Sequence, residues 1–135
     1  MSFALEIKNL KKVYAGGTEA LKGISLNVKE GDFYALLGPN GAGKSSTIGI
    51  IGTLVTKTSG SVKIFDVDID ENVAIAKSML GVVSQEINFS QFEKVHDIVI
   101  TQAGFYGIKK SIAEPKVEEM LKRLGLWDKR NDQAR

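Results

Sequence analysis

The stretch Gly38-Pro39-Asn40-Gly41-Ala42-Gly43-Lys44-Ser45 decides most of what this chain can be. It fits the pattern G-x-x-x-x-G-K-[ST] at every required position. Its flanks agree, because residues 32–37 form an apolar run typical of a buried parallel strand, and Ile48, Ile51 and Val55 follow at helical spacing. A strand, a glycine loop and a helix in this order predict a phosphate site, whereas an ordinary glycine-rich turn before a helix accounts for less of the pattern.

The chemistry of a triphosphate explains why these residue types are needed. Glycines let the backbone curl so that successive N–H groups face a dense anion, and the following helix adds its free N–H groups and its dipole. Lys44 is expected to reach the β- and γ-phosphates, and the Ser45 hydroxyl to coordinate Mg²⁺. Ser46 and Thr47 are expected to offer further hydroxyl groups to the α-phosphate.

Composition limits the remaining choices. The chain has 135 residues, 43% of them hydrophobic, which fits one compact soluble domain. Its 18 basic and 16 acidic residues give a net charge of +2, which is no argument for nucleic acid as a partner. Lysines come in pairs such as Lys11 and Lys12, for which solvated surface is the predicted role. Without cysteine, the chain can form no disulfide and holds no thiolate metal site.

The predicted secondary structure changes after Gln85 from mostly strands to helices alone. Before it, strands are predicted over residues 3–8, 24–28, 32–37, 61–65 and 80–83, with a short helix over 71–79. After it, helices are predicted over 95–106 and 111–124. At the start of the second helix, Ser111 and Glu114 have the spacing of a capping box. Gly125 is the residue at which this helix is predicted to end. Its predicted apolar face comprises Val117, Met120, Leu121 and Leu124. His96 is predicted to be structural or solvated, and Trp127 to pack the helices.

The motifs resemble those of the ATP-binding cassette of ABC transporters over essentially the whole chain. Residues 36–47 (L-L-G-P-N-G-A-G-K-S-S-T) are very close to that family's Walker A wording. Tyr14 matches the aromatic residue that stacks on adenine, and Gln85 in V-S-Q matches the glutamine of the Q-loop. Taken alone, Tyr14 could also be a strand-end residue that covers the core, and Gln85 a polar residue that ends a strand.

The resemblance implies an α/β fold, with a P-loop NTPase (RecA-like) core and an antiparallel β subdomain over residues 1–91, and the start of an α-helical subdomain over 92–135. ATP and Mg²⁺ are the implied ligands. Lys44 and Gln85 are implied as catalytic residues, and Ser45 and Gln85 as metal ligands. The residues implied to bind nucleotide are Tyr14, Gly38, Pro39, Asn40, Gly41, Ala42, Gly43, Lys44, Ser45 and Ser46.

The implied partners are a transmembrane permease and a second copy of the ATPase, and not nucleic acid. Residues 33–45 and the phrase Q-A-G-F-Y-G at 102–107 look most like cassettes of the ABC-2 export type. The protein would then be cytoplasmic and peripheral on the inner face of the cell membrane. Phe89 and Phe92 lie where the resemblance places a groove for the permease, although they could equally be local core.

Two features of the family are missing. ATP hydrolysis needs an Asp-Glu pair after a core strand, and the nearest candidate, Asp66, is followed by Val67 and comes too soon after the glycine loop. The L-S-G-G signature is absent too. A truncated cassette explains both, so we expect this chain to bind nucleotide without turnover and to expose apolar surface. A non-transport P-loop ATPase of DNA repair or chromosome maintenance is the remaining alternative, against which the charge balance, Tyr14 and Gln85 argue.

Overall fold

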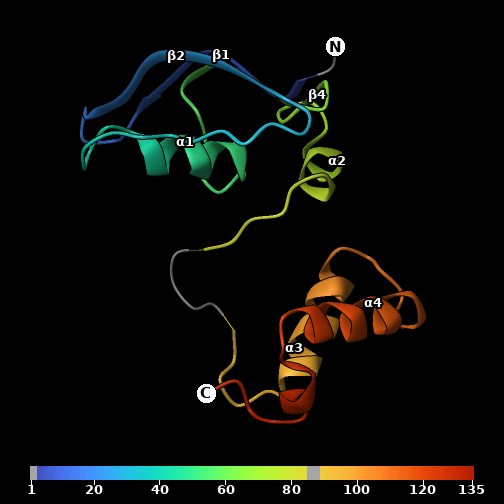
Figure 1. Cartoon of the computed structure of the whole chain (residues 1–135). Helices are drawn as coiled ribbons and strands as arrows, with labels where there is room; N and C mark the ends of the chain where they lie inside the picture. The colour runs from blue at the N-terminus through green and yellow to red at the C-terminus, as the bar shows by residue number, and fades with distance from the viewer. Residues whose placement is uncertain (1–2, 85–88) are drawn as a thin grey trace. The chain divides into compact units, whose positions relative to one another are not determined.

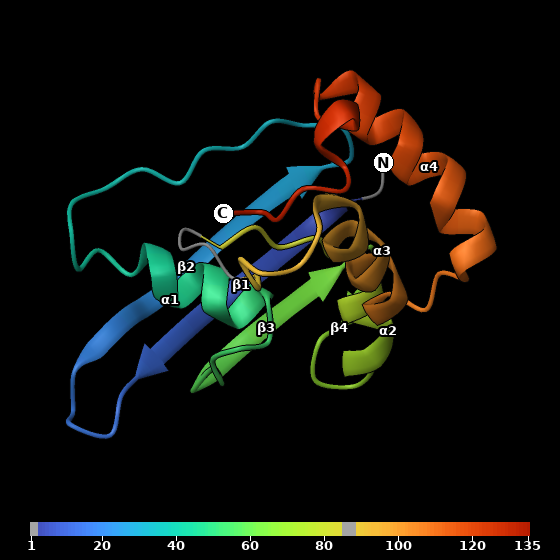
Figure 2. The ribbon, with the colours of Figure 1, turned by 90° about the horizontal axis from the view of Figure 1, so that it is seen from below.

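The computed structural model of the chain describes residues 3–84 and 89–135, which divide into two compact units, Met1–Val82 and Val83–Arg135. The first unit is a four-stranded sheet with the order β2-β1-β3-β4, antiparallel at every pairing (Figures 1 and 2). Its strands are β1 (Phe3–Val13), β2 (Glu19–Lys29), β3 (Ser59–Ile64) and β4 (Val67–Asp68). The predicted antiparallel β subdomain is therefore present, with longer first strands than the alternation indicated.

Two short helices accompany this sheet, α1 (Lys44–Ile51) and α2 (Val73–Ser78), where helices were predicted. Figure 1 shows α1 lying along one face of the sheet. Ile50 of α1 is fully buried, whereas Val55 comes after the helix has ended at Gly52. The apolar residues buried in the core of this unit are Ile7, Leu10, Leu21, Ile50, Val62, Ile64, Ile69 and Ala76.

An irregularity in β1 brings its core residues onto the same face of the sheet. Ile7 and Leu10 are both buried although they are three positions apart, which strict alternation would place on opposite faces. Between them Asn9 has a φ of 48°, and the register shifts against both neighbouring strands. β3 approaches so closely there that a Cβ on Gly60 would collide with the Asn9 carbonyl oxygen. Glycine at position 60 is therefore required by the bulge.

The two strands predicted for a parallel core are not formed. Residues 32–37 and 80–83 have no regular secondary structure and belong to no sheet within the part of the chain that the structure describes. A central parallel strand needs hydrogen-bonding neighbours and cover on both faces, and these two segments do not pair with each other. Leu36 and Leu80 are half-buried, but other apolar side chains of these segments lie in solvent: Phe33 is 99% exposed, Leu37 88% and Val83 97%.

Beside residues 32–37, helix α1 is only partly covered by the rest of the unit. An apolar cavity of about 430 Å³ lies between the sheet, residues 32–36 and α1. Its lining includes Leu5 and Leu26 from the sheet, Leu36 from the extended segment, and Ile48 and Ile51 from α1. The packing of α1 against the sheet thus buries Thr47 and Ile50 but leaves Ile48 exposed.

The second unit contains α3 (Val95–Phe105), α4 (Lys110–Arg123) and a short 3₁₀ helix, η1 (Trp127–Lys129). The predicted helices are confirmed, with α4 ending before Gly125. Its apolar face is narrower than predicted, because Val117 and Leu121 are buried with Ala113 while Met120 and Leu124 are exposed. Trp127 is half-buried, with the cationic groups of Lys122 and Arg130 over its ring.

The predicted capping box at the start of α4 is wrong. The helix begins one residue earlier, Lys109 is its N-cap, and no side chain caps it. Glu114 instead accepts a hydrogen bond from His96 on α3, with 2.8 Å between Oε2 and Nε2, while His96 Nδ1 lies 3.1 Å from Asp97 Oδ1. This tertiary pairing holds the beginnings of α3 and α4 together.

None of the helices in the described part of the chain combines the length and the apolar character that a membrane span requires.

The exposed apolar segments should make the 135-residue chain self-associate, because burying such surface between copies removes it from water. We expect the weight-average mass in sedimentation to rise with concentration in the micromolar range. Replacing Phe33 and Leu37 together by serine should lower the association. Phe105→Ser, which removes a single exposed phenylalanine from the second unit, is the matched control. A wild-type chain that sediments as a monomer throughout would contradict this expectation.

His96 should make the second unit more stable in mild acid. The hydrogen bond to Asp97 and that to Glu114 raise the pKa of His96 above its ordinary 6.5, although Lys110, 3.6 Å from Glu114, competes for that carboxylate. A raised folded-state pKa gives stability that is complete below about pH 6.5 and is lost as the pH rises through the folded pKa. Urea unfolding followed by the fluorescence of Trp127, the only tryptophan, should therefore show a stability advantage over His96→Gln at pH 6 that shrinks by pH 8.5. Equal pH slopes for both proteins would contradict it.

Candidate functional site

The glycine loop is an exposed turn that ends tightly against the sheet. Residues 38–42 are exposed, and the Ala42 N–H donates to the Pro39 carbonyl oxygen at 3.2 Å. Gly43, the N-cap of α1, has a φ of 85°. A Cβ on Gly43 would lie 2.6 Å from the carbonyl oxygen of Ala20 on β2. The loop can therefore reach the start of α1 only because residue 43 has no side chain.

The Lys44 side chain is hydrogen-bonded to the backbone of the glycine loop. Its ammonium group donates hydrogen bonds of 2.6 Å to the carbonyl oxygens of Gly38 and Pro39. An ammonium group has three N–H donors, so the third is left for an incoming anion. The side chain is half-buried and thus already held beside the loop. This places a positive charge at the mouth of the loop, where the sequence predicted a phosphate contact.

The three hydroxyl groups of the first turn of α1 have three different environments. Ser45 is exposed and faces no competing side chain that the structure records for the described residues. Ser46 Oγ lies 3.0 Å from the Tyr14 hydroxyl. Thr47 is buried and donates its hydroxyl to the Gly43 carbonyl oxygen at 2.9 Å, so the expectation that it offers this group to a phosphate is wrong.

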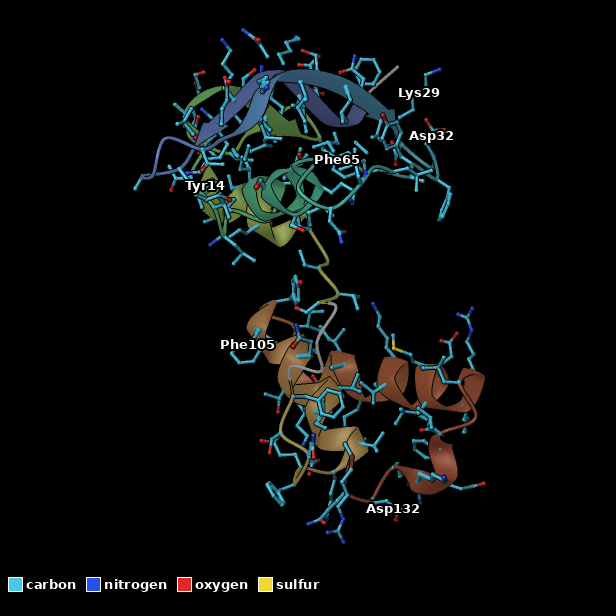
Figure 3. The ribbon with its side chains drawn as sticks, turned by 90° about the vertical axis from the view of Figure 1, so that its left-hand side faces the viewer. Tyr14, Lys29, Asp32, Phe65, Phe105 and Asp132 are labelled. Atoms are coloured by element: carbon cyan, nitrogen blue, oxygen red, sulfur yellow. The ribbon has the colours of Figure 1, made fainter. Side chains whose placement is uncertain are left out.

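Tyr14 follows the end of β1 and is brought beside α1 by its bond to Ser46 (Figure 3). Its backbone N–H donates to the Thr18 carbonyl oxygen at 2.9 Å, which closes the turn between β1 and β2. Lys12 Nζ lies 4.8 Å from the centre of the Tyr14 ring. The prediction that Lys12 is merely solvated surface is therefore wrong. Because β1 ends at Val13, strand alternation does not extend to Tyr14, and the sequence carries no signal that could have revealed this contact.

The remaining predicted site residues are not brought to the loop. Gln85 lies outside the described residues. Asp66 sits with Phe65 in the tight turn between β3 and β4, both with positive φ, which agrees with its rejection as a magnesium ligand. In residues 3–84 and 89–135, no group of three or more histidine or acidic side chains could hold a metal ion.

Comparison with known proteins finds relatives that match most of the chain. The family model described as "ABC transporter" matches residues 21–135. Linearmycin resistance ATP-binding protein LnrL of Bacillus subtilis is 37% identical over 128 residues, which make up 95% of this chain and 41% of LnrL. Methionine import ATP-binding protein MetN of Helicobacter pylori is 32% identical over 93% of this chain and 39% of MetN. The chain thus spans less than half the length of these relatives.

A solved structure is similar across both units. It is cbiO1 from Clostridium perfringens, described as part of the ABC transporter complex cbiONQ, with a TM-score of 0.81 and 27% identity. The similarity covers 98% of this chain and 55% of the cbiO1 chain. The sequence-based expectation of an α/β P-loop NTPase fold is confirmed by this similarity.

Gly43 offers a test of how the loop is held. Gly43→Ala should destabilise the first unit, since a left-handed residue with a side chain costs about 1–2 kcal/mol and the added Cβ would collide with Ala20. Gly41→Ala is the matched control, because φ there is 83° but nothing lies within 4 Å of the added Cβ. The urea midpoint should fall further for Gly43→Ala than for Gly41→Ala. Equal midpoints would show that the contact with β2 does not constrain the loop.

Proposed function

This chain belongs to the ABC transporter family, and on that premise we propose that it is part of an ATPase subunit that couples ATP to the movement of a substrate through a membrane permease. The observation that carries the proposal is the charge of Lys44 held at the loop mouth by two backbone carbonyl oxygens at 2.6 Å. An exposed loop with a fixed cation at its mouth, next to the first turn of a helix, suits the phosphates of a nucleotide.

ATP is the proposed nucleotide because two separate parts of the site suit its two ends. The glycine loop, Lys44 and Ser46 would take the phosphates, with the exposed Ser45 hydroxyl on Mg²⁺. The ring of Tyr14, tied to the first turn of α1, would stack on adenine at a distance from the phosphates that the bond to Ser46 fixes. Gln85 is proposed from the family resemblance to complete the magnesium shell and to orient the attacking water.

Turnover is proposed for the whole protein and not for these 135 residues. The charge that develops during phosphoryl transfer needs a carboxylate on the metal and a group that orients the attacking water. The sequence supplies neither an Asp-Glu pair after a core strand nor a signature motif. What these residues supply is the grip on the triphosphate, through Lys44 and the loop, and the magnesium ligand Ser45.

The proposed partners are a permease and a second copy of the ATPase. Support for a docking surface comes from Phe89 and Phe92, which are exposed in the second unit, Phe92 at 77%, and are therefore not local core. Export is proposed from the resemblance of residues 33–45 and 102–107 to cassettes of the ABC-2 type, although MetN, a relative with nearly as high an identity, is named for import. Attachment to the inner face of the cell membrane follows from the proposed permease.

Lys44→Ala should weaken ATP binding about 10- to 100-fold, because each hydrogen bond to a charged group contributes about 1.5–3 kcal/mol. Calorimetric titration of the chain with Mg-ATP measures the change. Lys77→Ala, which removes an equal charge from the exposed surface of α2, is the control and should leave the affinity unchanged. Unchanged affinity in Lys44→Ala would refute the assignment of the loop.

A further inference from the structure

We propose that Lys12 is a positioning residue for base recognition, whose ammonium group covers one face of the Tyr14 ring and leaves the opposite face for a purine. The proposal rests on the proposed ATP site and deepens it. It concerns how the base is selected, which the glycine loop cannot do because phosphates are common to all nucleotides.

Lys12 is held in place from two sides. Its Nζ donates a 2.6 Å hydrogen bond to the Thr56 carbonyl oxygen, in the segment after α1, and lies 4.8 Å from the centre of the Tyr14 ring. The side chain is half-buried, and among the described residues no carboxylate forms an ion pair with it. A cation without an anionic partner keeps its full attraction for the π-electrons of the ring.

Tyr14 is fixed just as firmly. Its hydroxyl bonds to Ser46, and the preceding residue Val13 donates its N–H to Thr58 Oγ1 at 2.9 Å. Lys12 and the end of β1 are therefore both hydrogen-bonded to the same segment, the one after α1 that contains Thr56 and Thr58. The ring is held at its backbone, at its hydroxyl and on one face, so little freedom is left to be lost when a base stacks on it.

The charge of Lys12 also affects which bases stack well on the opposite face of the Tyr14 ring. This charge draws π-electron density toward the covered face and leaves the open face poorer in electrons. An electron-rich, extended purine stacks better on such a face than a pyrimidine does. Lys12 would thus strengthen base stacking through Tyr14, without touching the nucleotide.

The test is a double-mutant cycle on the 135-residue chain. Lys12→Met, Tyr14→Leu and the double variant are titrated with Mg-ATP and with inorganic tripolyphosphate, which has no base. Lys12→Met should weaken ATP binding about two- to fivefold, the range expected for an exposed cation–π contact. It should leave tripolyphosphate binding unchanged and have no further effect once Tyr14 is leucine. Lys12→Arg should retain most of the ATP affinity, since a guanidinium group also binds aromatic faces.

Lys11→Met is the matched control, because it removes the neighbouring charge from the opposite face of β1 and should change neither affinity. Equal losses for ATP and tripolyphosphate in Lys12→Met would mean a direct or global effect of the charge and would overturn the inference. So would a loss that persists in the Tyr14→Leu background, or no loss at all. A wild-type chain that binds neither ligand would instead overturn the proposed function, and the inference with it.

Discussion

Ile50 has no exposure to solvent because it lies in one cluster with Ile7, Leu10 and Leu21 of the sheet. This buried apolar position of α1, one turn after the buried Thr47, fixes the helix on the sheet, and with it the glycine loop that leads into the helix. Full burial of one such side chain contributes about 1.5–3 kcal/mol, which is a large share of what so short a helix can gain. The position of the phosphate-binding residues therefore depends on packing that is remote from the phosphates.

The contrast between α1 and the segment before it shows what sequence can predict. Both are apolar, and both were expected to be buried. The helix is formed because the contacts that it needs are local hydrogen bonds and one sheet face, which the chain provides. Residues 32–37 and 80–83 pair with no strand among the described residues, because a parallel strand depends on neighbours elsewhere, and an apolar run indicates the need for burial without naming the partner. The Ser111–Glu114 box failed for a similar reason, since Glu114 is taken by His96 from another helix.

In the site, too, the features that depend on local sequence could be predicted, and those that depend on distant segments could not. The motif predicted a glycine loop that leads into a helix, and the structure has both, with Lys44 hydrogen-bonded to the loop. It could not distinguish the three consecutive hydroxyl groups, which the structure separates by burial and by partners, with Ser46 on Tyr14 and Thr47 on the backbone of Gly43. Nor could it find Lys12, because contact between Lys12 and Tyr14 depends on the segment after α1, more than forty residues away along the chain.

The bulge at Asn9 has a consequence beyond the core. By adding one residue between Ile7 and Leu10, it reverses the parity of the rest of β1, so that even-numbered positions after it share the side that α1 covers. Lys12 pairs in register with the buried Leu21, and Tyr14 follows two residues later, just after the strand has ended. In a regular strand, Lys11 and Val13 would take that side. The side of the sheet from which Lys12 reaches the ring of Tyr14 is thus set by one left-handed asparagine three residues before the lysine.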